Sequence, residues 1–195
     1  MATNTVYFIS EQYVKDNSPV SLAADAKLIS VSILDAMEVY VQPALGTRLY
    51  AKLKSLIAAG TITDPANAEY KDLLDNYVSR AVLYHTVSEL TTFVRWKITA
   101  KSVDGQSSDN GAPADLEELK YFRGELRNKA EFYTQRLIDR LAERGSTHLP
   151  EYGEATNEDE IDPRDNAYRT GMALDDDDCP CLRKMGYNDG IRRLD

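Results

Sequence analysis

The chain has 195 residues, of which 43% are hydrophobic, enough for one domain with a modest core. Its 23 Lys and Arg against 32 Asp and Glu give a net charge of −9, and this excess of acid argues against a protein that mainly grips nucleic-acid phosphates. No run approaches the roughly 20 apolar residues of a membrane span. The first residues also lack the basic and apolar regions of a signal peptide. We therefore expect no membrane contact, and a protein that works in a cytoplasm or in something assembled there.

The first elements expected along the chain are a short hook and a longer helix. Ser10 is placed to cap a helix that runs to about Asp16, and the turn residues 17–19 would end it. Residues 1–22 are therefore predicted to form an N-terminal helical hook. From about residue 23 to 41, apolar residues recur at steps of three and four, which predicts the buried face of an amphipathic helix. Its members are Leu28, Val31, Leu34, Met37 and Val41.

A sharp corner is predicted between residues 42 and 47. Pro43 and Gly46 should end the preceding helix, because proline lacks a backbone N–H and glycine adopts the left-handed conformation. Thr47 is placed to cap the next helix, which Gly60 would end. The residues of this helix-corner motif are Pro43, Leu45, Gly46, Thr47, Leu49 and Tyr50.

Two longer helices complete the predicted bundle. Asp64 and Pro65 form a helix start signal, and a broad apolar stripe then predicts a central helix to about Trp96. Residues 101–113 are rich in Ser, Asp, Asn and Gly, which predicts a loop. Helical spacing resumes from about residue 115 to 144, and Gly145 is expected to close that helix. The predicted fold class is all-α: a bundle of about four helices over residues 23–152.

Residues 153–195 differ in composition from the rest. They hold 12 acids and 6 bases, a net charge of −6 out of −9, and such a segment cannot bury enough apolar surface to fold by itself. We expect an extended acidic assembly arm that becomes ordered on a neighbouring subunit or ring. The candidate contacts on this arm are Ile161, Tyr168, Met172, Leu174, Asp175, Asp176, Asp177, Asp178, Leu182, Tyr187 and Ile191.

The acidic run of this arm needs a basic partner surface. The last predicted helix carries bases one turn apart, interleaved with acids, so a mixed solvent-facing surface is the simpler interpretation. The alternative is a docking face for an acidic segment, and its candidates are Arg136, Arg140 and Arg144.

Signals for catalysis or for a bound cofactor are weak. The two histidines, His85 and His148, are far apart, and none of the common phosphate-loop, metalloprotease or serine-hydrolase motifs is present. The acidic run before Cys179 and Cys181 has neither the spacing of a calcium loop nor a second cysteine pair for zinc. We therefore expect that the protein is not an enzyme and that it binds no cofactor and no metal ion.

Two segments carry a resemblance to a known family. The opening Phe8-Ile9-Ser10-Glu11-Gln12-Tyr13-Val14-Lys15-Asp16-Asn17-Ser18-Pro19-Val20 is followed by Val41-Gln42-Pro43-Ala44-Leu45-Gly46-Thr47-Arg48-Leu49-Tyr50-Ala51-Lys52-Leu53. In this order the sequence resembles the helical neck-ring proteins of crAss-like phages of gut Bacteroidetes, which lie beneath the portal. Further likeness comes from Val94-Arg95-Trp96-Lys97-Ile98-Thr99, from the loop at 102–113 and from Leu149-Pro150-Glu151-Tyr152. The arm after Tyr152 departs from the pattern.

The resemblance implies a structural virion protein of the phage neck, between capsid and tail, assembled in the bacterial cytoplasm. Its implied partners are other copies in a ring, twelve-fold like portals, together with the portal protein and further neck or tail rings. DNA would pass through the lumen without specific binding. The alternative from another class is a DNA-packaging ring like a terminase small subunit, which would need a basic recognition helix. A metal-dependent hydrolase built on the late Asp cluster is a third, weaker alternative.

Overall fold

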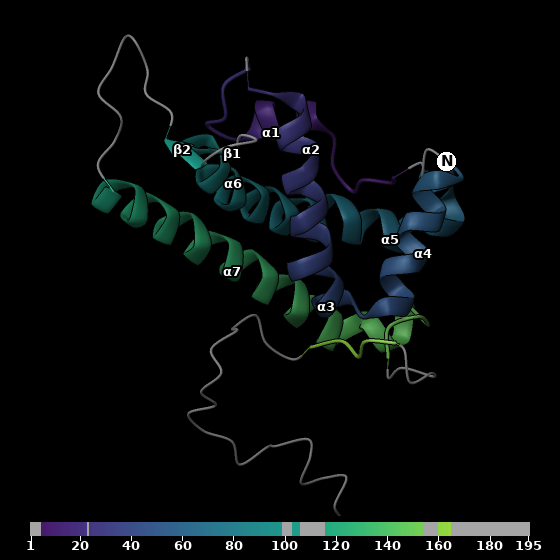
Figure 1. The fold of residues 1–195 in the computed structure, drawn as a ribbon. Coiled ribbons are helices and arrows are strands. Elements are labelled where there is room, and N and C mark those ends of the chain that lie inside the picture. The colour runs from purple at the N-terminus through teal and green to yellow at the C-terminus, as the bar shows by residue number, and fades with distance from the viewer. Residues whose placement is uncertain (1–4, 23, 99–102, 106–115, 154–159, 165–195) are drawn as a thin grey trace, which may run out of the picture.

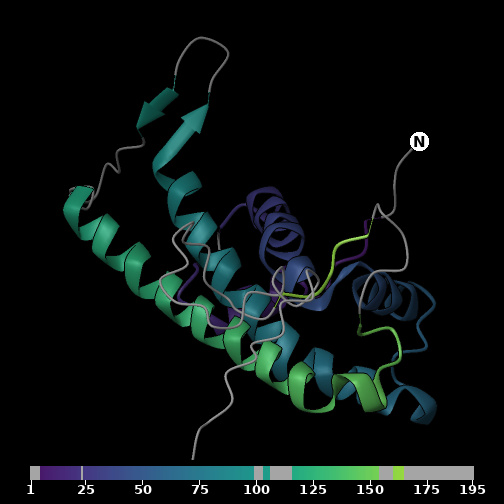
Figure 2. The ribbon, with the colours of Figure 1, turned by 90° about the horizontal axis from the view of Figure 1, so that it is seen from below.

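A computed structural model of the chain describes residues 5–22, 24–98, 103–105, 116–153 and 160–164. Its elements are helices α1 (Glu11–Asn17), α2 (Ala26–Asp35), α3 (Gln42–Leu45), α4 (Thr47–Ala58), α5 (Ala68–Leu73), α6 (Ser79–Arg95) and α7 (Leu116–His148), the π-helical turns η1 (Ala36–Val41) and η3 (Leu74–Val78), the 3₁₀ turn η2 (Pro65–Asn67) and strands β1 (Trp96–Ile98) and β2 (Val103–Gly105). The all-α prediction is confirmed. α6 runs through the middle, with α2 crossing it on one side and α7 lying alongside it on another (Figures 1 and 2).

The N-terminal hook packs onto the bundle. Ser10 caps α1 as predicted, because its Oγ accepts a hydrogen bond of 3.1 Å from the Tyr13 N–H. Phe8 is buried, its ring meets Tyr50 edge-on at 5.2 Å, and its N–H lies 3.4 Å from the Met37 sulfur. The hook therefore contributes to the same hydrophobic core as the helices that follow.

The first long helix differs from its prediction in its end and in its buried face. It continues through Pro43 to Leu45, because α2, η1 and α3 follow one another without a break. The wider π-turn directly before Pro43 accommodates a residue that has no N–H to donate. Leu28 and Val31 of the predicted buried stripe are exposed. The α2 residues that face the core are Ile29, Ser32 and Ile33.

α6 is the central helix, as predicted. None of the residues from Ser79 to Thr92 is exposed. The helical run that leads into it begins with Pro65 at the first position of η2, although the Asp64 side chain makes no capping hydrogen bond. At the other end the chain passes directly into β1, which pairs antiparallel with β2 in the register Trp96 opposite Gly105. This two-stranded ribbon replaces part of the predicted loop.

α7 is longer than predicted, and the turn after it is locked onto the bundle. It continues past Gly145 to His148. A Cβ atom at Gly145 would lie 2.5 Å from Cδ1 of Tyr152, so glycine here makes room for that ring rather than ending the helix. Glu151 accepts a hydrogen bond from the Tyr70 hydroxyl and lies 3.5 Å from Lys52 Nζ. Burial raises the pKa of Glu151, but the Tyr70 hydrogen bond, a backbone hydrogen bond and Lys52 outweigh it and leave the pKa lowered.

Within the described parts of the chain, one helix is long and apolar enough to cross a membrane. It is Ala26–Leu45, and half of it is buried within the bundle. The expectation that no segment approaches a membrane span is therefore wrong as a statement about length and composition. The core helix of a bundle passes the same test, so this is weak evidence for a membrane.

Candidate functional site

The helix corner is the first candidate site, and Gly46 produces it. Gly46 has φ +76°, the left-handed conformation that favours glycine, so α3 ends there and α4 begins at the next residue. Around it, Pro43, Leu45, Leu49 and Tyr50 are all buried. The predicted sharp corner is confirmed at this glycine.

Residues 160–164 form a clip on this corner. The Thr47 N–H donates to the Ile161 carbonyl at 3.1 Å, and the Ile161 N–H donates to the Thr47 Oγ1 at 2.8 Å. The Arg164 N–H donates to the Pro43 carbonyl at 2.9 Å. The last carbonyls and first N–H groups of helices have no partner within the helix, so the clip satisfies one such group on each side of Gly46. Thr47 is the first residue of α4 rather than its cap, and its hydroxyl serves the clip.

The clip changes the interpretation of the arm. The sequence predicts an arm that leaves the bundle after Tyr152 and crosses to a neighbour. In the structure its residues 160–164 return to the bundle of the same chain. Ile161 is 46% exposed, so its side chain can still contact another molecule. The other predicted arm contacts, from Tyr168 to Ile191, lie outside the residues that the structure describes.

Tyr50 is the buried polar residue of the corner motif. Its side chain is 6% exposed, and its hydroxyl has no hydrogen-bond partner within the described parts of the chain. Burial, with a smaller effect of the Glu38 charge, raises the pKa of Tyr50 to about 12. The phenol therefore stays neutral near pH 7, and its ring serves packing against Phe8.

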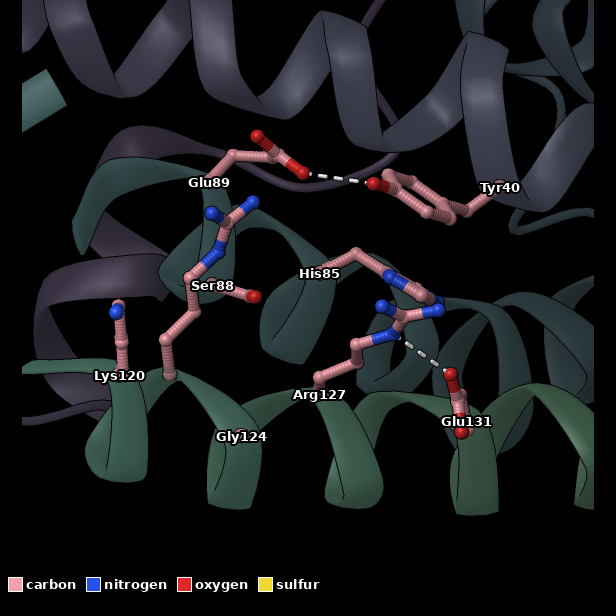
Figure 3. Close-up of a pocket in the computed structure, with 9 residues that line it drawn as sticks. Tyr40, His85, Ser88, Glu89, Lys120, Gly124, Arg127 and Glu131 are labelled. Atoms are coloured by element: carbon pink, nitrogen blue, oxygen red, sulfur yellow. Dashed lines mark hydrogen bonds and ion pairs between the residues drawn. The ribbon is translucent and has the colours of Figure 1, made fainter. Parts of the chain in front are cut away.

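The second candidate site is a groove of about 370 Å³, lined by η1, α6 and α7 (Figure 3). Tyr40 of η1 stacks on His85 of α6, with ring centroids 4.0 Å apart. The Tyr40 hydroxyl donates to Glu89 at 2.7 Å. His85 is 5% exposed, and its Nε2 lies 2.9 Å from Thr134 Oγ1, whose own proton goes to the Ala130 carbonyl. These contacts fix the inner wall of the groove as a packed polar cluster.

The outer wall of the groove is basic. Lys120, Arg123 and Arg127 line it from α7. Arg127 is held by Glu131, with Nε to Oε1 at 2.9 Å. Neither Lys120 nor Arg123 has an ion-pair partner within 4 Å among the described residues. The groove therefore offers two cations that form no ion pair with a described carboxylate, while Glu89 leaves one negative charge on the opposite wall.

Gly124 lies directly after Arg123 on the same wall of the groove. A Cβ atom there would meet nothing within 4 Å, so no described part of the chain requires glycine at this position. Glycine inside a helix costs about 1 kcal/mol relative to alanine. The backbone of α7 is therefore accessible along this wall of the groove.

The predicted basic docking face has a different role. Arg140 is 15% exposed at its side chain and pairs with Glu69 at 3.4 Å and Asp72 at 3.7 Å. The Arg136 guanidinium lies over the Tyr77 ring, 5.1 Å from its centroid. These two arginines bind α7 to the α5–η3 segment of the same chain. Arg144, the third of these arginines, is exposed, and no hydrogen bond, ion pair or ring contact joins it to another described residue.

Two apolar surfaces lie uncovered on different sides of α6. The first, here called the α2 face, comprises Leu28, Val31 and Val39. The second, the α7 face, comprises Tyr121, Phe122 and Phe132. Tyr121 is 73% exposed and Phe132 is 63% exposed. Exposed aromatic side chains gathered on one helix are typical of surfaces that bind a partner.

Metal ligands do not gather in the described residues, where no group of three or more His, Cys, Asp or Glu is placed to hold an ion. The acidic run 175–178 and the two cysteines lie outside the described residues, so the weak metal alternative stays untested there.

Comparison with known proteins gives one match. A model described as a family of unknown function, DUF6712, matches residues 41–160. No curated protein and no solved structure matches the chain. The matched region begins just before the helix corner and ends one residue before Ile161, so it extends past Tyr152 to the start of the clip.

The corner analysis predicts that Gly46→Val destabilises the fold by more than 1 kcal/mol. Valine is strained at a positive φ, and its Cβ would lie 2.9 Å from the Pro163 ring. Gly60→Val is the matched control, because Gly60 has φ +69° but nothing within 4 Å of a Cβ atom. Urea denaturation of both variants should show a larger loss for Gly46→Val. Equal losses would mean that the clip contributes nothing at this position.

Proposed function

The chain belongs to DUF6712, a family of unknown function, and we propose that it is a structural subunit that assembles into a ring in the neck of a tailed phage. The place in a phage neck rests on the sequence resemblance, through the opening segment, the Pro43–Tyr50 corner and Leu149–Tyr152. In this proposal the ring joins the portal protein to tail components and leaves a channel for DNA.

The observation that carries the ring proposal is the pair of uncovered apolar faces. α6 lies between α2 and α7 (Figure 2), so the outward sides of these two helices point in different directions. A face that binds a different face on the next copy makes a head-to-tail interface, and such interfaces close into rings when the rotation between copies allows it. The α2 face and the α7 face are both apolar, which suits them to each other.

The acidic arm fits the same proposal. Apolar residues spaced along a polar segment suit a chain that lies across a neighbouring surface and fills small pockets there. Ordering such a segment consumes part of its contact energy. The arm is therefore expected to add specificity between subunits or rings, while the helical faces supply most of the buried area.

The DNA-packaging alternative needs a surface that binds duplex DNA. Of the described helices, α7 carries the most bases, and its acids balance them. In the groove wall, Arg127 is already paired with Glu131.

The ring proposal predicts complementation between two variants. Leu28→Glu with Val31→Glu disables the α2 face, and Tyr121→Glu with Phe132→Glu disables the α7 face. Each double variant alone should be monomeric by analytical ultracentrifugation, because charge placed in an apolar contact opposes association. Mixed, they should form a one-to-one heterodimer, because each retains the face that the other lacks.

Ala142→Glu, at an exposed α7 position outside both faces, serves as the control and should assemble as the natural chain does. If either double variant still self-associates, or if the mixture stays monomeric, the head-to-tail interface between these faces is wrong.

The proposal also predicts weak binding to DNA. A subunit of net charge −9 should bind duplex DNA with a Kd above about 1 μM at physiological salt, within or weaker than the usual non-specific range. Filter binding across salt concentrations would measure this. A Kd well below 1 μM would favour the packaging alternative.

A further inference from the structure

The groove between η1 and α7 has an outer wall whose charge is incompletely neutralised. Lys120 and Arg123 form no ion pair with a carboxylate among the described residues. Of the two carboxylates that line the groove, Glu131 pairs with Arg127, whereas Glu89 accepts a hydrogen bond from the neutral Tyr40 and keeps its charge (Figure 3). Three bases and two acids therefore give the groove a net positive charge. Next to these cations, the absent side chain of Gly124 leaves room for another backbone to approach. A short acidic peptide matches this wall in charge and in the space it needs.

The chain itself contains such a peptide. Residues 175–178 are four consecutive aspartates. The clip holds the start of the arm close to the groove, because the Arg164 N–H binds the carbonyl of Pro43 and the groove residue Tyr40 lies three positions earlier in the same helical run. We propose that the acidic segment Asp175–Asp178 docks in this groove of its own chain, against Lys120, Arg123 and the open backbone at Gly124.

The length of the chain allows this contact. Ten residues separate Arg164 from Asp175, and the eleven steps between their Cα atoms span up to about 36 Å when the chain is extended. The wall from Lys120 to Glu131 measures about 16 Å along α7 at 1.5 Å per residue. A short tether also gives an effective concentration in the millimolar range, which favours the segment of the same chain over that of another copy.

This inference does not depend on the ring proposal. The proposed docking site also differs from the basic face predicted at Arg136, Arg140 and Arg144. Two of those arginines contact Tyr77, Glu69 and Asp72 of the same chain instead. If the aspartates are held in the groove, the apolar residues after them, Leu182, Tyr187 and Ile191, remain available to reach a neighbouring surface.

The natural cysteines provide the test, because Cys179 and Cys181 follow the aspartates directly. The full-length variant Gly124→Cys should form a disulfide with one of them under mild oxidation, since a disulfide requires close approach of the two Cβ atoms. We expect an intrachain product, found as a monomer on a non-reducing gel and identified by peptide mass spectrometry. Its yield should fall several-fold near 1 M salt, where charge attraction is screened.

Glu125→Cys is the matched control, because it follows directly in the same helix at an exposed position that does not line the groove. Its intrachain yield should be about tenfold lower. Equal yields from the two variants, or a crosslink only between chains, would overturn the proposal.

A second measurement covers the case in which the cysteines fail to meet in a bonding geometry. With a fluorophore on the natural cysteines, Lys120→Glu with Arg123→Glu should lower the anisotropy by freeing the segment. Lys129→Glu with Arg144→Glu makes the same charge change at exposed positions outside the groove and should leave the anisotropy unchanged. If the two double variants have the same effect, the segment does not dock in the groove.

Discussion

The burial of α6 from two sides is the constraint on which the rest of the structure depends. No residue between Ser79 and Thr92 is exposed. The flanking helices α2 and α7 therefore each pack their inner apolar residues against α6. No described element forms a further layer over the outer apolar residues of either helix, and Val31 on one and Phe132 on the other are exposed. The buried polar residues of α6 are accommodated locally, as the His85–Thr134 contact shows. The same packing that stabilises the bundle therefore also leaves the two faces on which the ring proposal rests.

The helix corner connects this bundle to the arm. A left-handed Gly46 leaves a carbonyl at the end of α3 and an N–H at the start of α4 that need partners, and the clip supplies both through its own backbone. This arrangement fixes the start of the arm beside α3, which continues the helical run of the groove residue Tyr40. The proposed docking of the acidic run and the proposed outward reach of the later apolar residues both begin from this fixed point.

Much of the fold could be predicted from the sequence because local signals and tertiary packing agree. The period of the apolar residues indicated the central helix, and Gly46 marked the corner. The buried side of α2 could not be derived in this way, because the apolar residues of that helix surround it almost completely and packing on α6 selected Ile29 and Ile33 over Leu28 and Val31. The π-turn before Pro43 escaped prediction because a proline in a helical pattern is usually read as an end.

The two contacts that define the candidate sites had weaker signals. The clip is made mainly by backbone groups of a polar segment, which carry no pattern in the sequence. The groove cations were predicted to lie on a solvent face, and the available signal was their position beside the buried stripe: Arg127 follows the buried Leu126 directly. Arg140, in contrast, forms long-range ion pairs with Glu69 and Asp72 of α5. The spacing of residues along one helix does not indicate such contacts.

The central claim is that two different apolar faces of one subunit bind each other and close into a ring around a channel. Negative-stain electron microscopy of the purified full-length chain, at concentrations where it self-associates, tests this most directly. The account predicts class averages of closed rings with a central channel and cyclic symmetry, twelve-fold if the ring matches a portal. Monomers at every concentration, or two-fold dimers that bury the α7 face against itself, would contradict it.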